Sequence, residues 1–549
     1  MSRRRSPFAR LVDGIGTRRR GLTPATHDYT VERGLRVPMR DGVELVADLY
    51  QPVGTGRGLI LVRSAYGRGF LLANEYARPY AERGFAVLMQ STRGTFGSGG
   101  TKVPFHGEID DGADTVEWLR HQSWFPGRFG MHGASYLGFN AWAVMMSAPP
   151  ELATAVLPFS PHNLGRILHE SGTTTIQTAL QFSDSFSRQE SDSLVTQVRR
   201  GAAAPRRHAP VFSALPMLGA EAELLAGRAP WYREWLGHTD PDDPYWSDGD
   251  FDAAVQRADI PLLIQAGWND VFLDGNVAEY ETLRSRGVPV AITIGPWIHG
   301  DIGGSSSSTL STEALAWFGA HLAGEPDTRL ERPVRIFVTG AEEWRFLPSW
   351  PPAAQDRTQR LGSAGTLADA GSTGSTSFTY DPATPTPSVG GASQAKDAGV
   401  RDNAALESRG DVLTFSTEML TSDLEVIGAP RIRLFHDTDN PHADLFVRVC
   451  DVDEQGRSFN VTERYLRLDP SAASGELELS LRPMAHRFLA GHRVRVQLSG
   501  GAHPRYLRNL GTDAPQGEGT ELVPSHRTVW HDADRPSSIT LPIPTEAQQ

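Results

Sequence analysis

The sequence contains one cysteine, Cys450, and no long uninterrupted apolar run. A single cysteine cannot form an intrachain disulfide or a thiolate metal cluster, so nothing here requires an oxidising compartment. No run reaches the roughly 18 apolar residues that a membrane helix needs. These absences predict a soluble, cytoplasmic protein.

Basic residues are also in the minority, with 53 Lys and Arg against 65 Asp and Glu, and the formal net charge is −12. A surface of that sign repels phosphate backbones and anionic lipids, so we expect neither nucleic-acid binding nor a membrane partner. The arginines at 3–5 and 18–20 form a basic leader. Arg10 and Asp13 stand where a signal peptide would be apolar, so we expect residues 1–36 to be a frayed leader.

The 549 residues predict two to four domains. Short apolar runs alternate with amphipathic stretches over 37–160 and again over 260–350, which predicts a mostly parallel, doubly wound α/β sheet. Within the first stretch, Asp41-Gly42 predicts a β-hairpin turn. Between the two stretches, residues 161–259 have helical periodicity and no strand-like runs, which predicts a helical cap insertion.

The composition changes after Trp350. Residues 362–398 are rich in Gly, Ser, Thr, Pro and Ala and are typical of a linker or long surface loops. Beyond Asp411 the apolar runs alternate with period two, which predicts an all-β sandwich or jelly roll. We therefore assign 351–549 to a linker and a C-terminal β domain.

The strongest chemical signal is G-M-H-G-A-S-Y-L-G, which follows an apolar strand and precedes a helix-like run. In that setting Ser135 lies on a sharp strand-to-helix turn that exposes its hydroxyl, with the next N–H available to an oxyanion. The second glycine is Gly138, one position later than in the usual G-x-S-x-G spacing. An ordinary helix N-cap serine would fit the same position.

A nucleophilic hydroxyl needs a base, and the base needs an acid to orient it. Asp270 ends L-L-I-Q-A-G-W-N-D, right after a strand-like run, and His299 ends A-I-T-I-G-P-W-I-H, after the next such run. Their order after the serine is that of a doubly wound hydrolase. His106, His132 and His162 fit less well, because His132 precedes the serine within its own strand and the other two follow no strand end.

Motifs along nearly the whole chain, from Val37 to about Leu541, resemble the cocaine esterase / X-prolyl dipeptidyl-peptidase family of serine hydrolases. The motifs include S-A-Y-G-R, G-A-S-Y-L-G, G-W-N-D-V-F, G-P-W-I-H-G and G-H-R-V-R-V-Q-L-S-G-G-A-H-P-R-Y-L-R-N. The G-x-S-Y-x-G spacing is this family's own form. The resemblance implies an α/β-hydrolase fold with a helical cap and a C-terminal jelly roll.

The resemblance implies Ser135 as nucleophile, Asp270 as the acid that orients the base, and His299 as the base. It also implies that Tyr66 donates to the oxyanion through its phenol, beside the N–H of Tyr136. No cofactor and no metal are expected. Three aromatic residues flank the acid and the base and are candidates for the substrate pocket, although the hydrophobic core explains them equally well: Trp268, Phe272 and Trp297.

Two positions depart from the family pattern. Relatives often carry D-x-R-G and S-E-G around Arg93, where this chain has Ser91 and Gly99. We expect altered hydrogen bonding in the loops rather than lost activity.

The predicted substrate is a small ester or amide with an uncharged acyl group. Similar amino-acid ester hydrolases have acidic residues two and three positions after the triad aspartate, where this chain has Phe272 and Leu273. An α-amino acyl esterase or X-Pro peptidase is one alternative, and a non-catalytic binding protein on a hydrolase scaffold is another. The sequence leaves open whether the protein forms a homo-oligomer.

Overall fold

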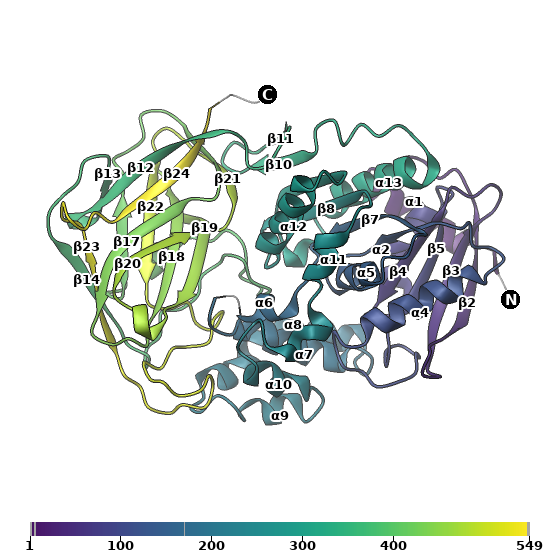
Figure 1. Ribbon diagram of the computed structural model, residues 1–549, viewed down its shortest axis with the longest axis horizontal. Helices are drawn as coiled ribbons and strands as arrows, with labels where there is room; N and C mark the ends of the chain where they lie inside the picture. Colours follow the sequence, from purple (N-terminus) through teal and green to yellow (C-terminus); the bar gives the residue numbers. More distant parts are fainter. Residues whose placement is uncertain (1–2, 5–6, 170, 546–549) are drawn as a thin grey trace. The chain divides into compact units, whose positions relative to one another are not determined.

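The computed structural model describes residues 3–4, 7–169 and 171–545. The chain divides into two compact units, whose elements are labelled in Figure 1. We call the first the α/β unit; it consists of Met1–Leu164, Pro244–Gly267 and Gly275–Arg335. The second is the β unit, consisting of Gly165–Asp243, Trp268–Asp274 and Ile336–Gln549.

A mostly parallel sheet forms the centre of the α/β unit. Its strands are β1 (Arg3–Arg4), β2 (Tyr29–Pro38), β3 (Glu44–Pro52), β4 (Leu59–Ser64), β5 (Ala86–Ser91), β6 (Phe129–His132), β7 (Leu152–Pro158), β8 (Leu262–Asn269) and β9 (Val290–Ile298). Their order in the sheet is β1-β2-β3-β5-β4-β6-β7-β8-β9. Strands β2, β3 and β5 pair antiparallel, and the pairs from β5 through β4, β6 and β7 to β8 are parallel. The predicted hairpin turn at Asp41-Gly42 connects β2 and β3.

Helices cover both faces of this sheet. They are α1 (Pro7–Arg19), α2 (Phe70–Tyr76), α3 (Arg78–Ala81), α4 (Glu108–Arg120), α5 (Tyr136–Met146), α11 (Asp252–Arg257), α12 (Leu273–Ser285) and α13 (Ser307–Ala323), with the 3₁₀ turns η1 (Pro244–Gly249) and η2 (His299–Asp301). In β4, Val62 packs in one cluster with Phe318 of α13, whereas the next residue, Arg63, donates to the Glu108 carbonyl of α4. Successive strand residues point to opposite faces, so the predicted doubly wound α/β fold is confirmed.

The N-terminal segment is more ordered than the expected frayed leader. Helix α1 occupies Pro7–Arg19, and β2 already begins at Tyr29. The buried Asp13 carboxylate accepts from the Tyr29 hydroxyl at 2.9 Å and pairs with Arg78 at 3.2 Å. These partners lie far along the chain, and they anchor the helix. Residues 1, 2, 5 and 6 of the leader lie outside the described residues.

The β unit contains a large antiparallel arrangement of strands. They are β12 (Ala354–Gly362), β13 (Thr366–Ala368), β14 (Ser375–Tyr380), β15 (Val412–Ser416), β16 (Leu424–Gly428), β17 (Arg431–Thr438), β18 (Asp444–Val452), β19 (Ser458–Arg467), β20 (Gly475–Ser480), β21 (Met484–Phe488), β22 (Arg493–Ser499), β23 (Ser525–Trp530) and β24 (Ser538–Pro544). The main order is β14-β23-β17-β24-β12-β13-β15-β22-β18-β19, with β20 on β17 and a separate β16-β21 pair. Strands β10 (Val334–Val338) and β11 (Glu343–Leu347) precede them in the chain.

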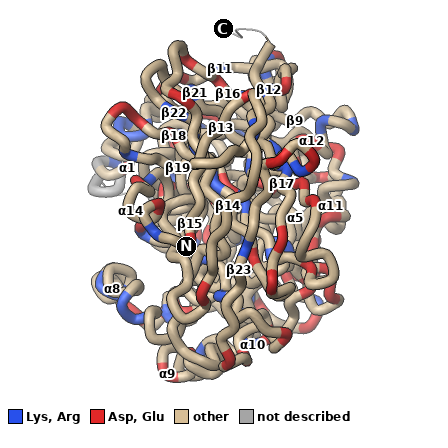
Figure 2. Tube along the Cα trace, turned by 90° about the vertical axis from the view of Figure 1, so that its left-hand side faces the viewer, with Lys and Arg blue, Asp and Glu red and all other residues tan. Residues whose placement is uncertain are grey.

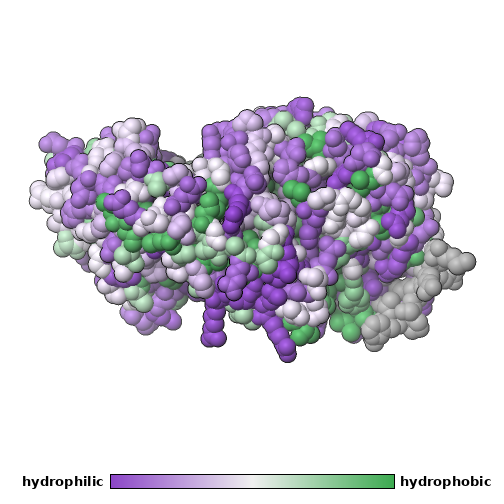
Figure 3. Space-filling view, turned by 90° about the horizontal axis from the view of Figure 1, so that it is seen from below, coloured by the Kyte–Doolittle hydropathy of each residue, from purple (hydrophilic) through white to green (hydrophobic). Residues whose placement is uncertain are grey.

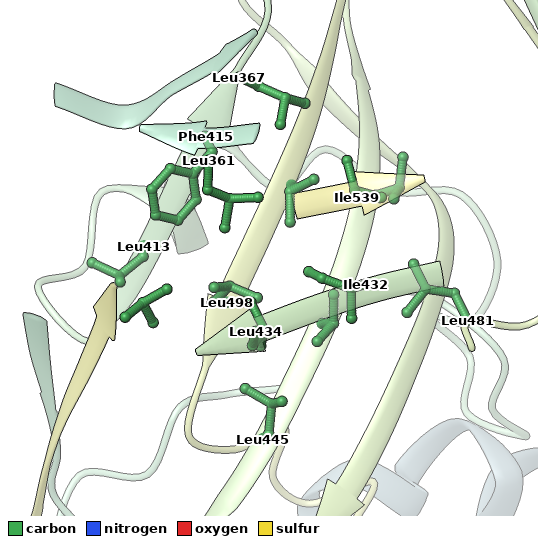
Figure 4. Close-up of a cluster of buried hydrophobic side chains, with 14 of the residues drawn as sticks. Leu361, Leu367, Leu413, Phe415, Ile432, Leu434, Leu445, Leu481, Leu498 and Ile539 are labelled. Carbon is green, nitrogen blue, oxygen red and sulfur yellow. The ribbon is translucent and has the colours of Figure 1, made fainter. Parts of the chain in front are cut away.

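Alternating apolar residues build the core of the β unit. In β22, for example, Val494, Val496 and Leu498 are fully buried. Figure 4 shows the side chains of Leu434, Leu498 and their neighbours converging between the strands. The stretch 362–398, expected to be linker or loops, instead contributes β13 and β14, because its few apolar residues (Leu367, Phe378 and Tyr380) fill this core.

Helices occupy the segment between β7 and β8, where sequence periodicity predicted them. They are α6 (Leu164–His169), α7 (Ile176–Arg188), α8 (Leu194–Ser213), α9 (Glu221–Leu225) and α10 (Trp231–Gly237), followed by η1 and α11. Further short elements of the β unit are α14 (Ala404–Glu407), η3 (Ser363–Gly365) and η4 (Pro470–Ala472). The compact units place 165–243 with the β strands, whereas the expected cap insertion spanned 161–259. The domain limits 37–160, 260–350 and 351–549 stay a prediction.

Charged residues of both signs are interspersed along the chain, as Figure 2 shows. The face drawn in Figure 3 is mainly hydrophilic, with hydrophobic residues in small groups. None of the helices in the described residues is long and apolar enough to cross a bilayer.

Candidate active site

Ser135 lies on the sharp turn between β6 and α5. Its backbone has φ 58° and ψ −127°, a conformation that L-residues with a side chain rarely adopt. The two flanking glycines make the turn sterically feasible. A Cβ on Gly133 would lie 2.2 Å from the Leu137 Cβ, and one on Gly138 would lie 2.3 Å from the Ser160 hydroxyl. The later position of the second glycine therefore reflects the close approach of α5 to Ser160.

The end of β7 fixes the backbone of this turn. The Ser135 N–H donates to the carbonyls of Pro158, at 3.2 Å, and Phe159, at 3.1 Å. Phe159 itself has a positive φ of 47°. Each such strained residue costs on the order of 1–3 kcal/mol and persists only where its surroundings enforce it. Ser135 and Phe159, which its N–H contacts, are thus both strained.

His299 reaches the serine from the end of β9. Its Nε2 lies 3.1 Å from the Ser135 Oγ, within hydrogen-bond distance for a nucleophile and its base. The imidazole packs edge-on against the Phe159 ring, with centroids 6.2 Å apart and planes at 85°. The η2 turn that carries His299 is closed by Asp301, which accepts from the Ile298 N–H at 2.9 Å.

Tyr66 follows β4 and approaches the same serine oxygen. The Ser135 hydroxyl interacts with its phenol and favours a lower pKa of that phenol. Burial raises the pKa of Tyr66 to about 12, so the phenol keeps its proton, and its capacity to donate, at neutral pH. Gly67, with φ 87°, completes the bend, because a Cβ there would lie 2.8 Å from the Phe96 ring.

Arg68 fastens the loop that carries Tyr66. Its Nη1 donates to the Ser91 Oγ, and its Nε lies 3.6 Å from an Asp48 oxygen. Ser91, one of the two positions that depart from the family pattern, is thus a hydrogen-bond partner in this loop. At the other, the Gly99 N–H donates to the Glu44 carbonyl at 2.9 Å.

Tyr136 is the first residue of α5, so its N–H lies at the positive end of the helix dipole. Its side chain is buried and stacks on Phe105, with ring centroids 4.3 Å apart. The phenol donates to the Glu108 carboxylate at 3.1 Å and accepts from the Phe105 N–H.

Asp270 directly follows β8 and belongs to the Trp268–Asp274 segment of the β unit. The residue is fully buried, and its Oδ1 accepts from the Phe272 N–H at 2.7 Å. Its carbonyl accepts from the Arg482 guanidinium, and Arg482 also pairs with Asp274 at 2.7 Å. Residues of the same unit therefore hold the loop that presents this carboxylate.

The three candidate pocket aromatics are all buried. Trp268 donates through its indole N–H to the Phe337 carbonyl at 2.7 Å and packs against Trp350. Trp297 contacts the Phe159 ring, with centroids 6.1 Å apart. Within the described residues, no group of three or more His, Cys, Asp or Glu could hold a metal ion.

Sequence reasoning missed three residues near the serine: Arg63, Glu108 and Phe159. Phe159 ends an apolar strand in the same way that Asp270 and His299 do, and that placement could have identified it. Arg63 is a lone charge within the apolar run of β4, a pattern that indicates a buried partner elsewhere.

Comparison with known families agrees with this architecture. A family model described as X-Pro dipeptidyl-peptidase (S15 family) matches residues 41–301. A second, described as the X-Pro dipeptidyl-peptidase C-terminal non-catalytic domain, matches residues 328–540. Cocaine esterase from Rhodococcus sp. (strain MB1 Bresler) is 31% identical over 94% of this chain and 99% of its own.

Solved structures share the fold. A selenomethionine-labelled α-amino acid ester hydrolase aligns with a TM-score of 0.78 and 23% identity, covering 95% of this chain and 97% of its own. An aminopeptidase from the marine sediment archaeon Thaumarchaeota archaeon has the same TM-score and identity, covering 95% of this chain and 98% of its own. With its α/β-hydrolase fold and β-rich C-terminal domain, this chain belongs to the X-Pro dipeptidyl-peptidase (S15) family of hydrolases and is related in sequence to cocaine esterase.

Proposed function

We propose that the protein is a serine esterase that cleaves small carboxylic esters through an acyl-enzyme on Ser135. One observation carries the proposal: on a strained turn, the Ser135 Oγ lies 3.1 Å from the His299 Nε2. A nucleophilic hydroxyl within hydrogen-bond distance of a base is what acyl transfer needs, and the phenol of Tyr66 lies beside this half-buried serine as a donor for the oxyanion. An N-cap serine would need neither partner.

In the proposed mechanism, His299 takes the proton of Ser135 as the serine oxygen attacks the ester carbonyl. The carbonyl oxygen becomes an oxyanion, which accepts from the Tyr66 phenol and the Tyr136 N–H. His299 then gives its proton to the departing alcohol, which leaves the acyl group on the serine. Water, deprotonated by the same histidine, attacks the acyl-enzyme and releases the acid and the free serine.

Asp270 is the proposed acid that orients His299. Its support is topological: β7, β8 and β9 are neighbours in the sheet, and Asp270 and His299 follow β8 and β9 in turn. Functional residues of open α/β sheets gather at the carboxyl ends of such strands. The aspartate would fix the imidazole tautomer and stabilise the imidazolium.

The neighbourhood of Asp270 supports a preference for uncharged acyl groups. Recognition of an α-ammonium needs a carboxylate without another counter-ion, since burial of an unpaired cation is costly. Asp274, the nearest carboxylate after Asp270 in the chain, pairs with Arg464 at 2.9 Å and with Arg482 at 2.7 Å. Two arginines therefore already neutralise it. Phe272, Trp268 and Trp297 stay predicted pocket residues.

A first experiment tests the nucleophile. A fluorophosphonate probe should label the wild-type protein and leave Ser135→Ala unlabelled, while the circular dichroism of the two agrees. Tyr66→Phe serves as the matched control, because it keeps the nucleophile and should label slowly. Absence of labelling in the wild type would favour the non-catalytic binding protein and refute the proposal.

A second experiment tests the substrate class. The value of kcat/KM for a phenylacetyl ester is compared with that for the matching phenylglycyl ester at pH 7. The two acyl groups differ only by the α-ammonium, so we expect the phenylacetyl ester to react faster. Equal or faster turnover of the charged ester would favour an α-amino acyl esterase or X-Pro peptidase. The cytoplasmic location stays a prediction, and the oligomeric state stays open.

A further inference from the structure

Three buried side chains form a polar network next to the proposed oxyanion hole. The exposed fractions of Arg63, Glu108 and Tyr136 are 0%, 2% and 2%. Glu108 begins α4, directly after Gly107 with φ 74°. Three different elements of the α/β unit (β4, α4 and α5) thus meet at one carboxylate.

The two carboxylate oxygens of Glu108 have different partners. The Oε2 lies 2.9 Å from the Arg63 Nη2, and the Oε1 accepts from the Tyr136 hydroxyl at 3.1 Å. A second nitrogen of Arg63, Nη1, donates to the Glu108 carbonyl at 2.9 Å. Glu108 therefore bridges the arginine and the tyrosine.

Each partner of Glu108 is close in sequence to a proposed oxyanion donor. Arg63 is three residues before Tyr66, and its carbonyl accepts from the Asn140 side chain of α5 at 2.9 Å. Tyr136 supplies the other donor through its own N–H, one residue after the nucleophile. The rings of Tyr66 and Tyr136 meet edge to face, with centroids 6.2 Å apart. The carboxylate thus joins the two segments whose separation sets the width of the oxyanion hole.

We propose that Glu108 is a positioning residue that fixes the two oxyanion donors relative to each other by holding Arg63 and the Tyr136 phenol. The inference rests on the proposed esterase function. Glu108 does not touch the substrate; it acts through the backbone of Tyr136 and the end of β4. A buried ion pair often adds little net stability, so we assign this pair a geometric role.

The test uses the full chain with Glu108→Gln, which keeps the shape and an acceptor for Tyr136 but removes the charge facing Arg63. The readouts are kcat and KM on a phenylacetyl ester, and the inhibition constant of 1,1,1-trifluoro-3-phenylacetone. This ketone adds to the serine and places an oxyanion in the hole. We expect kcat to fall about tenfold to a hundredfold, less than for loss of a whole donor, with KM within about twofold. The inhibition constant should rise by the same factor as kcat falls.

Asp13→Asn is the matched control. Asp13 is likewise a buried carboxylate that accepts from a tyrosine hydroxyl and pairs with an arginine, but it joins α1, β2 and α3. It should lower the melting temperature and leave kcat and the inhibition constant within about twofold of wild type. A merely structural Glu108 would behave in the same way, and that result would overturn the proposal.

Tyr136→Phe provides a second route, in case Glu108→Gln does not fold. It removes only the hydroxyl and should produce a smaller loss of kcat than Glu108→Gln, with the inhibition constant rising by the same factor as kcat falls. Where both single variants fold, the double variant should be no worse than Glu108→Gln, because the tyrosine acts through the same carboxylate. Wild-type values for Tyr136→Phe would refute the proposal. Failure of the proposed function is distinguished by the wild type, which would then bind neither the ketone nor the fluorophosphonate.

Discussion

Glu108 in the α/β unit and Glu463 in the β unit are both buried glutamates with arginine partners, yet their pKa values shift in opposite directions from the ordinary value. Burial raises the pKa of Glu108 to about 7, although one guanidinium, that of Arg63, opposes the rise. Glu463 pairs with Arg448 and Arg505 and accepts from the Ala392 N–H at 3.0 Å, which together hold its pKa far below the ordinary range. A second cation and a backbone donor thus decide the direction in which the carboxyl pKa shifts.

The same contrast holds for the backbone. In the α/β unit, Phe105, Ser135 and Phe159 have positive φ and are connected to the candidate site through contacts with Tyr136 or the serine itself. The core of the β unit instead consists of regularly alternating strands (Figure 4). The α/β unit thus has strained residues and a weakly compensated charge at its candidate site, whereas Glu463 in the β unit is compensated by two cations and a backbone donor. Substitution of Glu108 should therefore change activity, and substitution of Glu463 should change stability.

The largest effect is expected for Asp270→Asn, which tests the proposed acid. The amide favours the wrong tautomer of His299, so kcat should fall by roughly 10⁴. The measurement is kcat on the phenylacetyl ester at pH 7. The control is Asp274→Asn, which breaks the pairs with Arg464 and Arg482 and should mainly lower the melting temperature. Full activity of Asp270→Asn would place the acid elsewhere.

Glu463→Gln should have its effect on stability. It leaves Arg448 and Arg505 buried without their counter-charge, and breaking such a buried pair costs about 3–5 kcal/mol. Urea unfolding should show that loss in the free energy of unfolding. The folded variant should keep kcat within about twofold at 25 °C. A large fall in kcat of the fully folded variant would contradict the predicted contrast between Glu108 and Glu463.

Tyr66→Phe should lower kcat by about 10²–10³, or roughly 2.7–4 kcal/mol, because it removes one proposed oxyanion donor. KM should change little, since the phenol is expected to bind charge that develops in the transition state. Steady-state kinetics separates the two constants. If only KM changed, Tyr66 would belong to substrate binding instead.

Local signals explain what could be predicted from the sequence. The turn at Ser135 was predictable because strand, glycines and helix are contiguous from Gly130 to Met146. Asp270 and His299 could be identified because each stands just after an apolar run that predicts a strand. Apolar runs that alternate with amphipathic stretches likewise predicted the α/β fold, and the period-two alternation of apolar residues predicted the β-rich C-terminal domain.

Long-range partnerships explain what was not predicted. Arg63 and Glu108 are 45 residues apart, and Glu108 and Tyr136 are 28 apart, so no local pattern connects them. Helix α1 depends on Asp13 contacts with residues 16 and 65 positions away. Within 362–398, β14 pairs with β23 from near the end of the chain, and β13 pairs with β12 and β15. A composition rich in Gly, Ser and Pro does not reveal these pairings.

The smallest expected effect is a pH dependence that compares the two glutamates directly. The pKa of Glu108 rises from 4.5 in the unfolded chain to about 7 in the folded one, because desolvation outweighs Arg63 and the Tyr136 hydrogen bond while Asp111 adds to the rise. A raised carboxyl pKa means that the folded state holds the proton more tightly. Stability from this group is therefore full below pH 4.5 and is lost as the pH rises toward 7, by at most about 3 kcal/mol. Glu463 has the opposite sign, since its lowered pKa gives stability that is full above pH 4.5 and is lost on acidification.

The measurement is the free energy of unfolding between pH 4 and 8. Two differences are taken: wild type minus Glu108→Gln, and wild type minus Glu463→Gln. The first difference should fall with rising pH, and the second should be flat above pH 5 and fall toward pH 4. A first difference that rises with pH would mean that the Arg63 charge outweighs desolvation, and that the two glutamates are alike.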